Sequence, residues 1–237
     1  DLAAQRFPVE QHGGPGIGQQ FPTLAAVAVG IEHEPALWSQ QIGAVVHEGE
    51  DLGFGGGKAQ GLVGCWRFDG CDGKTVRDSS GAGNDGEIAS GELRKERGTT
   101  ALELDGMDGC VRVAPKTPFA LSTAITAVLW VNPAKLKNNT VLFGVPNAKP
   151  DWATPVFGMY LSGNHVVYGQ FGDKRAPKAL VESKAELEKG RWTCLTATSD
   201  GASLRLYVDG AVDAELKQPS SLGFNGQPLL IGAGLGG

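Results

Sequence analysis

Short apolar segments recur along the chain from residue 61 onward, and polar turn residues separate them. Most of these segments are four to eight residues long, and they either alternate apolar with polar positions or form one continuous apolar run. Both patterns are typical of β-strands. The predicted strands are Leu62–Phe68, Ala101–Leu104, Cys110–Val113, Ala124–Val131, Val141–Phe143, Val156–Leu161, His165–Phe171, Trp192–Thr198, Ser203–Val208, Val212–Leu216 and Pro228–Ile231.

Turn signals join several of these strands directly. Asp209-Gly210 stands between two alternating segments, and Asp-Gly favours the type I′ turn of a two-residue β-hairpin. Ser162-Gly163-Asn164 joins two further strands, and Asp200-Gly201 provides a third turn. The only segment that suggests a helical turn is Ser183–Lys189, which is short and polar. Many antiparallel strands without helices predict an all-β fold, a two-sheet sandwich or jelly roll.

Residues 1–60 have a different texture. Two glycine-rich stretches, Gly13–Gly18 and Gly53–Gly57, bracket a section in which apolar residues follow neither a period of two nor a period of 3.6. We therefore expect residues 1–60 to be an irregular leader and linker, and residues 61–237 to be one domain. The chain shows no initiating Met and no signal-peptide pattern, so we interpret it as processed or partial.

Charge and composition narrow the classes of partner. Residues 1–60 carry two basic and seven acidic side chains, whereas the remainder carries 19 of each. A balanced main body has no basic surface for a phosphate backbone or an anionic lipid, so we expect neither nucleic acid nor membrane as a partner. The 36 glycines and 13 prolines, with 41% hydrophobic residues, indicate a turn-rich globular chain.

Four cysteines leave two interpretations open. Cys65 and Cys71 are six residues apart across Asp69-Gly70, a spacing that a turn can close into a disulfide. Such a bond indicates an oxidising compartment. The alternative is that the cysteines are buried free thiols in strands.

An ordered series of motifs resembles the bacterial laminin-G-like, or concanavalin A-like, jelly-roll domains. The matching segments span most of residues 61–237, and they are Gly61–Asp69 with Trp66-Arg67-Phe68-Asp69, Val76–Gly86, Ala101–Gly106, Cys110–Val113, Trp130–Pro133, Gly190–Trp192, the Asp200-Gly201 turn, Leu204–Gly210 and Leu229–Gly232. The resemblance implies an exported protein, extracellular or periplasmic, in which such a module is often a neighbour of catalytic domains. It also implies a further closing strand after the Ile231-Gly232 segment. This chain lacks one, which leaves a sheet edge open unless a segment within residues 20–46 fills the gap.

The loop from Asp78 to Gly86 has two interpretations. Its short polar side chains and glycines suit a self-capped turn. They also suit calcium, which prefers carboxylate and carbonyl oxygens and which relatives of this fold often bind. The candidate calcium ligands are Asp69, Asp78, Asn84 and Asp105.

A carbohydrate site needs an aromatic face beside polar side chains. Trp66, Trp130 and Trp192 lie within apolar strands, and we expect them in the core. Trp152 instead lies in a polar loop bounded by prolines, where it either stacks on a sugar or covers the sandwich as a lid. The predicted carbohydrate-binding residues are Asp151, Trp152, Tyr160, Tyr168 and Gln170.

Catalytic motifs are missing from the sequence. No Gly-x-Ser-x-Gly, His-Glu-x-x-His or phosphate-loop pattern occurs. The nearest approach to the paired carboxylates of a glycan hydrolase is Glu182, Glu186 and Glu188, in a segment that reads as solvated. We therefore predict a non-catalytic module of a larger protein that binds a polysaccharide or glycoconjugate, with no cofactor except a structural calcium ion. The alternatives are a spacer domain without a sugar site and a hydrolase of the same fold.

Overall fold

A computed structural model describes residues 62–96, 99–104, 109–114, 124–146, 157–170, 179–217 and 227–234, together with the backbone of residues 23–30. Almost all regular structure in these ranges is β-strand, and the one helix is the three-residue 3-10 turn η1, Phe68–Gly70. Within the described ranges, no helix has the length and apolar character needed to cross a membrane. Ser183–Lys189 is not a helix, so that expectation was wrong.

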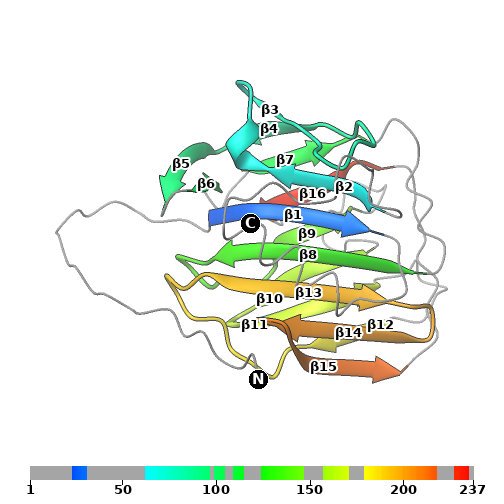
Figure 1. Cartoon of the computed structure of the whole chain (residues 1–237). Coiled ribbons are helices and arrows are strands. Elements are labelled where there is room, and N and C mark those ends of the chain that lie inside the picture. The colour runs from blue at the N-terminus through cyan, green and yellow to red at the C-terminus, as the bar shows by residue number, and fades with distance from the viewer. Residues whose placement is uncertain are drawn as a thin grey trace, which may run out of the picture.

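Sheet A forms one layer of the molecule (Figure 1). Its spatial order is β15-β14-β13-β8-β1-β6-β5, and β2 pairs beside β6 on the same side of β1. The strand bounds are β1 Thr23–Gly30, β2 Leu62–Arg67, β5 Glu92–Glu96, β6 Thr99–Glu103, β8 Ile125–Asn132, β13 Thr193–Ser199, β14 Ser203–Val208 and β15 Ala211–Lys217.

Sheet B forms the second layer, in the order β12-β11-β10-β9-β16-β7-β4-β3. Every pairing in both sheets is antiparallel, as the turn signals predict. The strand bounds are β3 Thr75–Val76, β4 Gly86–Ser90, β7 Cys110–Val113, β9 Thr140–Val145, β10 Phe157–Ser162, β11 His165–Gln170, β12 Ala179–Glu182 and β16 Leu229–Gly234. The predicted all-β two-sheet sandwich is therefore confirmed.

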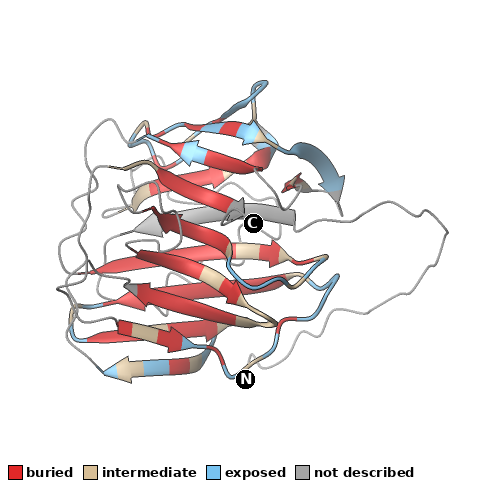
Figure 2. Cartoon of the chain, turned by 180° about the vertical axis from the view of Figure 1, so that it is seen from behind, coloured by how far each residue is buried: buried red, intermediate tan, exposed pale blue. Residues whose placement is uncertain are grey.

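The core lies between the two sheets and is built by alternation along the strands. On β8, the inward residues Ile125, Ala127 and Leu129 are each at most 1% exposed. They meet sheet B residues such as Phe143 and Met159, which are fully buried. Figure 2 shows burial concentrated in the central strands, with exposed residues on the edge strands β5 and β15.

The tryptophan prediction holds only in part. Trp66 is fully buried in the core, and its indole Nε1 donates to the carbonyl of Asn84 over 2.7 Å. Trp130 is half-buried and belongs to a second cluster with Val128, on the outer face of sheet A. Trp192 is half-buried and precedes β13. The expectation that all three line the core is therefore wrong. For Trp130 the reason is that β8 carries apolar residues on both of its faces, so the sequence does not show which face points into the core.

Residues 23–30 are not an irregular leader. They form β1, which enters the middle of sheet A and pairs with β8 on one side and with β2 and β6 on the other. A segment within residues 20–46, the range expected to fill an open place in the sheet, is therefore part of sheet A. The remaining residues of the expected leader lie outside the described residues.

Candidate functional site

The predicted carbohydrate platform divides between the two faces of sheet B. Tyr168 on β11 is fully buried, and its ring packs edge-on against Phe157 with centroids 5.6 Å apart. It belongs to the core between the sheets, so its assignment to a binding surface was wrong. Asp151 and Trp152 lie outside the described residues. The backbone of Gln170 pairs with Phe157 and Ala179, and its side chain lies outside the described part.

Tyr160 occupies the outer face of sheet B. Its neighbours on β10, Met159 and Leu161, point into the core, so alternation places Tyr160 on the opposite side, where it is half-buried. Strand register continues the row from Tyr160 to Val167 on β11 and then to Glu182 on β12. Glu182 is exposed. An aromatic ring and a carboxylate therefore flank one apolar residue in a single row.

A row of glycines runs beside this one. Gly144, Gly158 and Gly169 are direct partners on β9, β10 and β11. A Cβ on Gly158 would overlap the carbonyl oxygen of Phe143 and lie 2.8 Å from the Cα of Gly144, so these strands approach too closely for a side chain. Gly144, Gly158 and Gly169 are themselves buried, so this row brings three strands close together and offers no open surface next to Tyr160.

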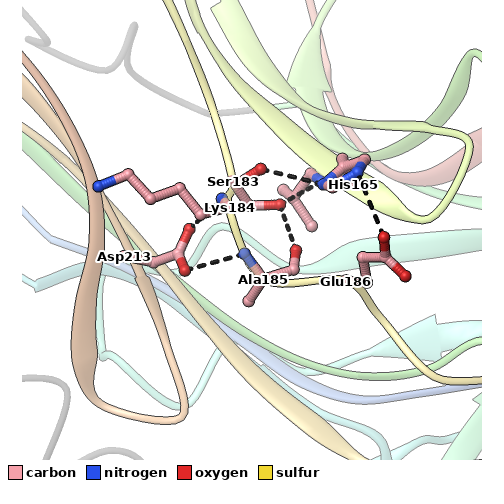
Figure 3. Close-up of polar contacts among 7 residues, drawn as sticks. His165, Ser183, Lys184, Ala185, Glu186 and Asp213 are labelled. Atoms are coloured by element: carbon pink, nitrogen blue, oxygen red, sulfur yellow. Dashed lines mark hydrogen bonds and ion pairs between the residues drawn. The ribbon is translucent and has the colours of Figure 1, made fainter.

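His165 and Glu186 border the same face at the end of β11 (Figure 3). The Nδ1 atom of His165 lies 3.0 Å from the carbonyl oxygen of Ser183, and Nε2 lies 3.9 Å from a carboxylate oxygen of Glu186. Backbone contacts fix this corner, because Ser183 Oγ accepts from the N–H of Val166 and donates to the carbonyl of Ala185. Ser183 and His165 therefore do not form a nucleophile and base pair.

Asp213 on β15 holds the segment that carries Glu186. Its two carboxylate oxygens accept from the N–H of Lys184 over 2.6 Å and from the N–H of Ala185 over 3.0 Å. Figure 3 shows the ammonium of Lys184 directed away from His165 and Glu186. The Lys184 side chain therefore does not neutralise Glu186, and the face keeps the two carboxylates of Glu182 and Glu186.

The surroundings of Tyr160 change the pKa of its phenol. Partial burial, and after it the negative charge of Glu182, raise the pKa of Tyr160 above its ordinary value. The hydroxyl therefore keeps its proton at neutral and mildly alkaline pH and stays a hydrogen-bond donor. We define the outer surface formed by Tyr160, His165, Val167, Glu182 and Glu186 as the tyrosine face.

The three candidate hydrolase carboxylates do not converge on one another. Glu186 pairs with His165, whereas Glu188 lies 3.4 Å from Arg191. The side chains of Glu186 and Glu188 are 66% and 70% exposed, so neither is desolvated as a general acid requires. Glu186 and Glu188 thus do not form the acid and base pair that glycoside hydrolysis uses.

The predicted calcium ligands do not fit a metal site where they are described. The Asp78 carboxylate accepts the backbone N–H groups of Cys65, Ser80 and Asn84, each at 2.9 Å. Asp69 instead pairs with Arg67 at 2.7 Å. Asp105 lies outside the described residues, and in the described part no group of three candidate ligands gathers. This arrangement favours the interpretation of a self-capped loop.

The predicted disulfide between Cys65 and Cys71 is absent, and all four thiols are free. Cys65 points to the outer face of sheet A, where it packs with Val128 and Cys194. Cys71 packs against the core between the sheets. Spacing along the chain suggested the bond, but the strand places the two side chains in different clusters.

Sequence reasoning missed most of the tyrosine face. The pattern Phe157-Gly158-Met159-Tyr160-Leu161 is sufficient to place Tyr160 opposite the core residues. On β11, however, the three consecutive apolar residues Val166 to Tyr168 do not alternate with polar ones, so the sequence does not show which of them point into the core. Glu182 and Glu186 stood out in the sequence only as candidate catalytic groups. The position of Glu182 in the row of Tyr160 follows from β11–β12 pairing, and that of Glu186 beside His165 from the segment after β12, so neither follows from local sequence.

Comparison with family models gives one match. A model described as the concanavalin A-like lectin/glucanases superfamily matches residues 105–237, more than half of the chain. No curated protein matches the sequence significantly.

Several solved structures share the fold. The binding domain of botulinum neurotoxin DC in complex with SialylT has a TM-score of 0.52 and 13% identity, over 69% of this chain and 42% of that chain. The receptor-binding domain of botulinum neurotoxin type G has a TM-score of 0.51 and 14% identity, over 68% of this chain and 41% of that chain. This chain therefore spans less than half the length of either toxin domain.

A further structure is domain 4 of AbnA, a GH43 extracellular arabinanase from Geobacillus stearothermophilus, in complex with arabinotriose. Its TM-score is 0.49 with 17% identity, over 73% of this chain and 83% of that chain. At such low identities the likenesses to the two toxin domains bear on the fold and not on the ligand.

Proposed function

Because the chain belongs to the concanavalin A-like lectin/glucanase superfamily, we propose that it is a non-catalytic module that binds carbohydrate through the tyrosine face. The module belongs to a larger exported protein, and its partner is a polysaccharide or glycoconjugate. The superfamily includes both lectins and glucanases, so membership alone does not choose between binding and hydrolysis.

The observation that carries this proposal is the row Tyr160, Val167 and Glu182 on the outer face of sheet B. An aromatic ring offers its face to the C–H surface of a sugar, and a nearby carboxylate accepts hydrogen bonds from sugar hydroxyls. The buried glycine row beside it holds β9, β10 and β11 at close spacing. Rigid strands hold these groups in place, so binding requires little ordering of the protein.

Binding is preferred over hydrolysis because of the carboxylates. Glu186 and Glu188 are exposed and lie beside different side chains, Glu186 at 3.9 Å from His165 and Glu188 at 3.4 Å from Arg191. A binding surface needs no tuned acid, whereas glycoside cleavage does.

We expect Tyr160→Ala to weaken glycan binding about five- to tenfold, which corresponds to about 1 kcal/mol of stacking. Binding is first sought on an array of plant, algal and host glycans, with and without calcium, and the affinity for the best ligand is measured by calorimetry. Tyr160→Phe keeps the ring and should retain most of the affinity. Glu182→Gln should weaken binding, whereas the matched control Glu188→Gln, at another exposed glutamate, should not.

Three results would contradict the proposal. An array without any ligand in either condition supports a spacer domain. Equal affinity of Tyr160→Ala and the unmodified chain, with unchanged melting temperatures, removes the tyrosine face from the site. Release of reducing ends from the bound glycan identifies a hydrolase instead.

A further inference from the structure

Strand β1 is the backbone link between the two halves of sheet A. On one side it pairs with β8 along its whole length, from Thr23 opposite Asn132 to Gly30 opposite Thr126. On the other side it pairs with β2 over Ala26 to Gly30 and with β6 at Thr23 and Leu24. Within the described part of sheet A, strands β2, β5 and β6 reach β8 only through β1.

The slot that holds β1 has the character of a strand-binding site. Its two walls are the edges of β8 and of β2 with β6, and both offer backbone hydrogen bonds in register. The occupant, Thr-Leu-Ala-Ala-Val-Ala-Val-Gly, contains no charged residue and no proline, the features that protect an edge strand from pairing with other chains. If β1 leaves its place, the edges of β8 and of β2 with β6 are left unpaired, and so are both edges of β1. These edges can pair with one another again.

The covalent connection does not dictate which slot β1 enters. Gly30 and Leu62 are direct partners, a position that a short turn can join, yet residues 31–61 separate them. Docking within one chain and docking into a second copy form the same ladder of hydrogen bonds, and only the path of the connection differs. A second copy must compete with the docking of β1 in its own chain, for which we take an effective concentration of about 10 mM, the millimolar range that covalently linked segments reach.

We propose that β1 is an exchangeable strand and that a second copy of this chain can receive it between β8 and β2, forming a dimer by reciprocal exchange. The proposal is independent of the carbohydrate site, because the slot lies in sheet A and the tyrosine face in sheet B. It identifies a surface for self-association and the residues that specify it.

A single substitution makes the exchange visible. Ala28 on β1 is the direct partner of Cys65 on β2, and Cys65 is a free thiol. Paired residues on neighbouring antiparallel strands have Cα atoms about 4.5 to 5.5 Å apart, within the range that a disulfide spans. The Ala28→Cys chain is prepared in two forms, one with natural isotopes and one labelled with ¹⁵N. The two forms are unfolded and mixed in equal amounts. They are then refolded under reducing conditions and oxidised. Peptide mass spectrometry determines whether the link to Cys65 joins equal or different isotopes.

We expect links between chains to be about one-tenth of the total after refolding an equal mixture at about 1 mM. Half of them join like isotopes, so links between different isotopes should be about one-twentieth, and they should fall about tenfold at about 0.1 mM because docking in the other copy is bimolecular. Val29→Cys, which lies opposite Gly64, controls for register and should give no such link. Ala28→Cys with Cys65→Ser controls for links through Cys71, Cys110 and Cys194. Links confined to single chains at about 1 mM overturn the exchange, and absence of the link to Cys65 at every concentration overturns the strand pairing on which it rests.

Discussion

Tyr168 shows how much depends on the face of a strand to which one residue points. Its ring fills the core, packed edge-on against Phe157, yet no described residue bonds its hydroxyl. A buried hydroxyl without a partner costs free energy, because water is lost and nothing replaces it. Complete burial also raises the pKa of Tyr168 far above its ordinary value, so the group stays a neutral phenol.

We therefore expect Tyr168→Phe to increase the free energy of unfolding by about 1 kcal/mol. Urea denaturation followed by fluorescence measures the change. Tyr160→Phe, at the half-buried tyrosine on the adjacent strand, is the matched control and should alter stability less. A loss of stability in Tyr168→Phe would show that the hydroxyl has a partner.

The Asp78 loop is the residue-scale result that sequence anticipated best. Asp, Asn and Gly in close succession predicted a turn that bonds its own backbone. The Asp78 carboxylate does so, and it also reaches the N–H of Cys65 on β2. Local chemistry predicted the first part, whereas the second depends on where the loop meets the sheet.

At the scale of the element, the glycine row reveals how closely β9, β10 and β11 approach. The register brings Gly144, Gly158 and Gly169 side by side, although they are far apart in sequence. A Cβ on Gly158 meets backbone atoms, which cannot turn aside as a side-chain end can. A substitution there must push two strands apart.

Gly158→Ala should lower the free energy of unfolding by about 2 to 3 kcal/mol, the cost of overpacking a core strand. Gly73→Ala is the comparison, because its Cβ meets no atom within 4 Å and only its φ of 60° is unfavourable. That substitution should cost about 1 kcal/mol. Equal costs in urea titrations of the two variants would show that strand spacing at Gly158 is not limiting.

Strand β1 is an element that sequence located only broadly, as a segment within residues 20–46 that could fill the sheet. Its apolar run suits a strand, but nothing near residues 23–30 predicts a partner. Strands β3, β4, β5 and β12 were missed for another reason, since they are short or highly polar and carry little periodic signal.

At the scale of the whole molecule, two buried thiols couple stability to pH. Burial, reinforced by Asp78, raises the pKa of Cys65 from 9.0 to about 12. Burial and Asp209 likewise raise the pKa of Cys194 to about 12. The unfolded chain releases these protons near pH 9, whereas the folded chain holds them to about pH 12. Stability from these groups is therefore complete below pH 9 and is lost as the pH rises toward 12.

We expect the free energy of unfolding to fall by about 2 kcal/mol per thiol between pH 9 and pH 11. Urea titrations at several pH values measure this slope. Cys65→Ala and Cys194→Ala should each make the slope shallower, measured against the variant's own stability at pH 8. Cys71→Ala, at a less buried thiol, should change it less, and a slope unaffected by either buried cysteine would refute the linkage.

The sequence by itself determined the β-class, most of the strands of residues 62–234 and the hairpin turn at Asp209-Gly210, whose φ values of 50° and 80° agree with the predicted turn. These features depend on neighbouring residues, so local pattern and backbone preference suffice. Only the tertiary structure decided that Tyr168 and Trp130 exchange their expected places, that Cys65 and Cys71 lie in different clusters, and that β1 completes sheet A. The alternation of apolar and polar residues along a strand predicts which residues share a face. Which face is buried depends on the segments that pack against it, and these are distant in the chain.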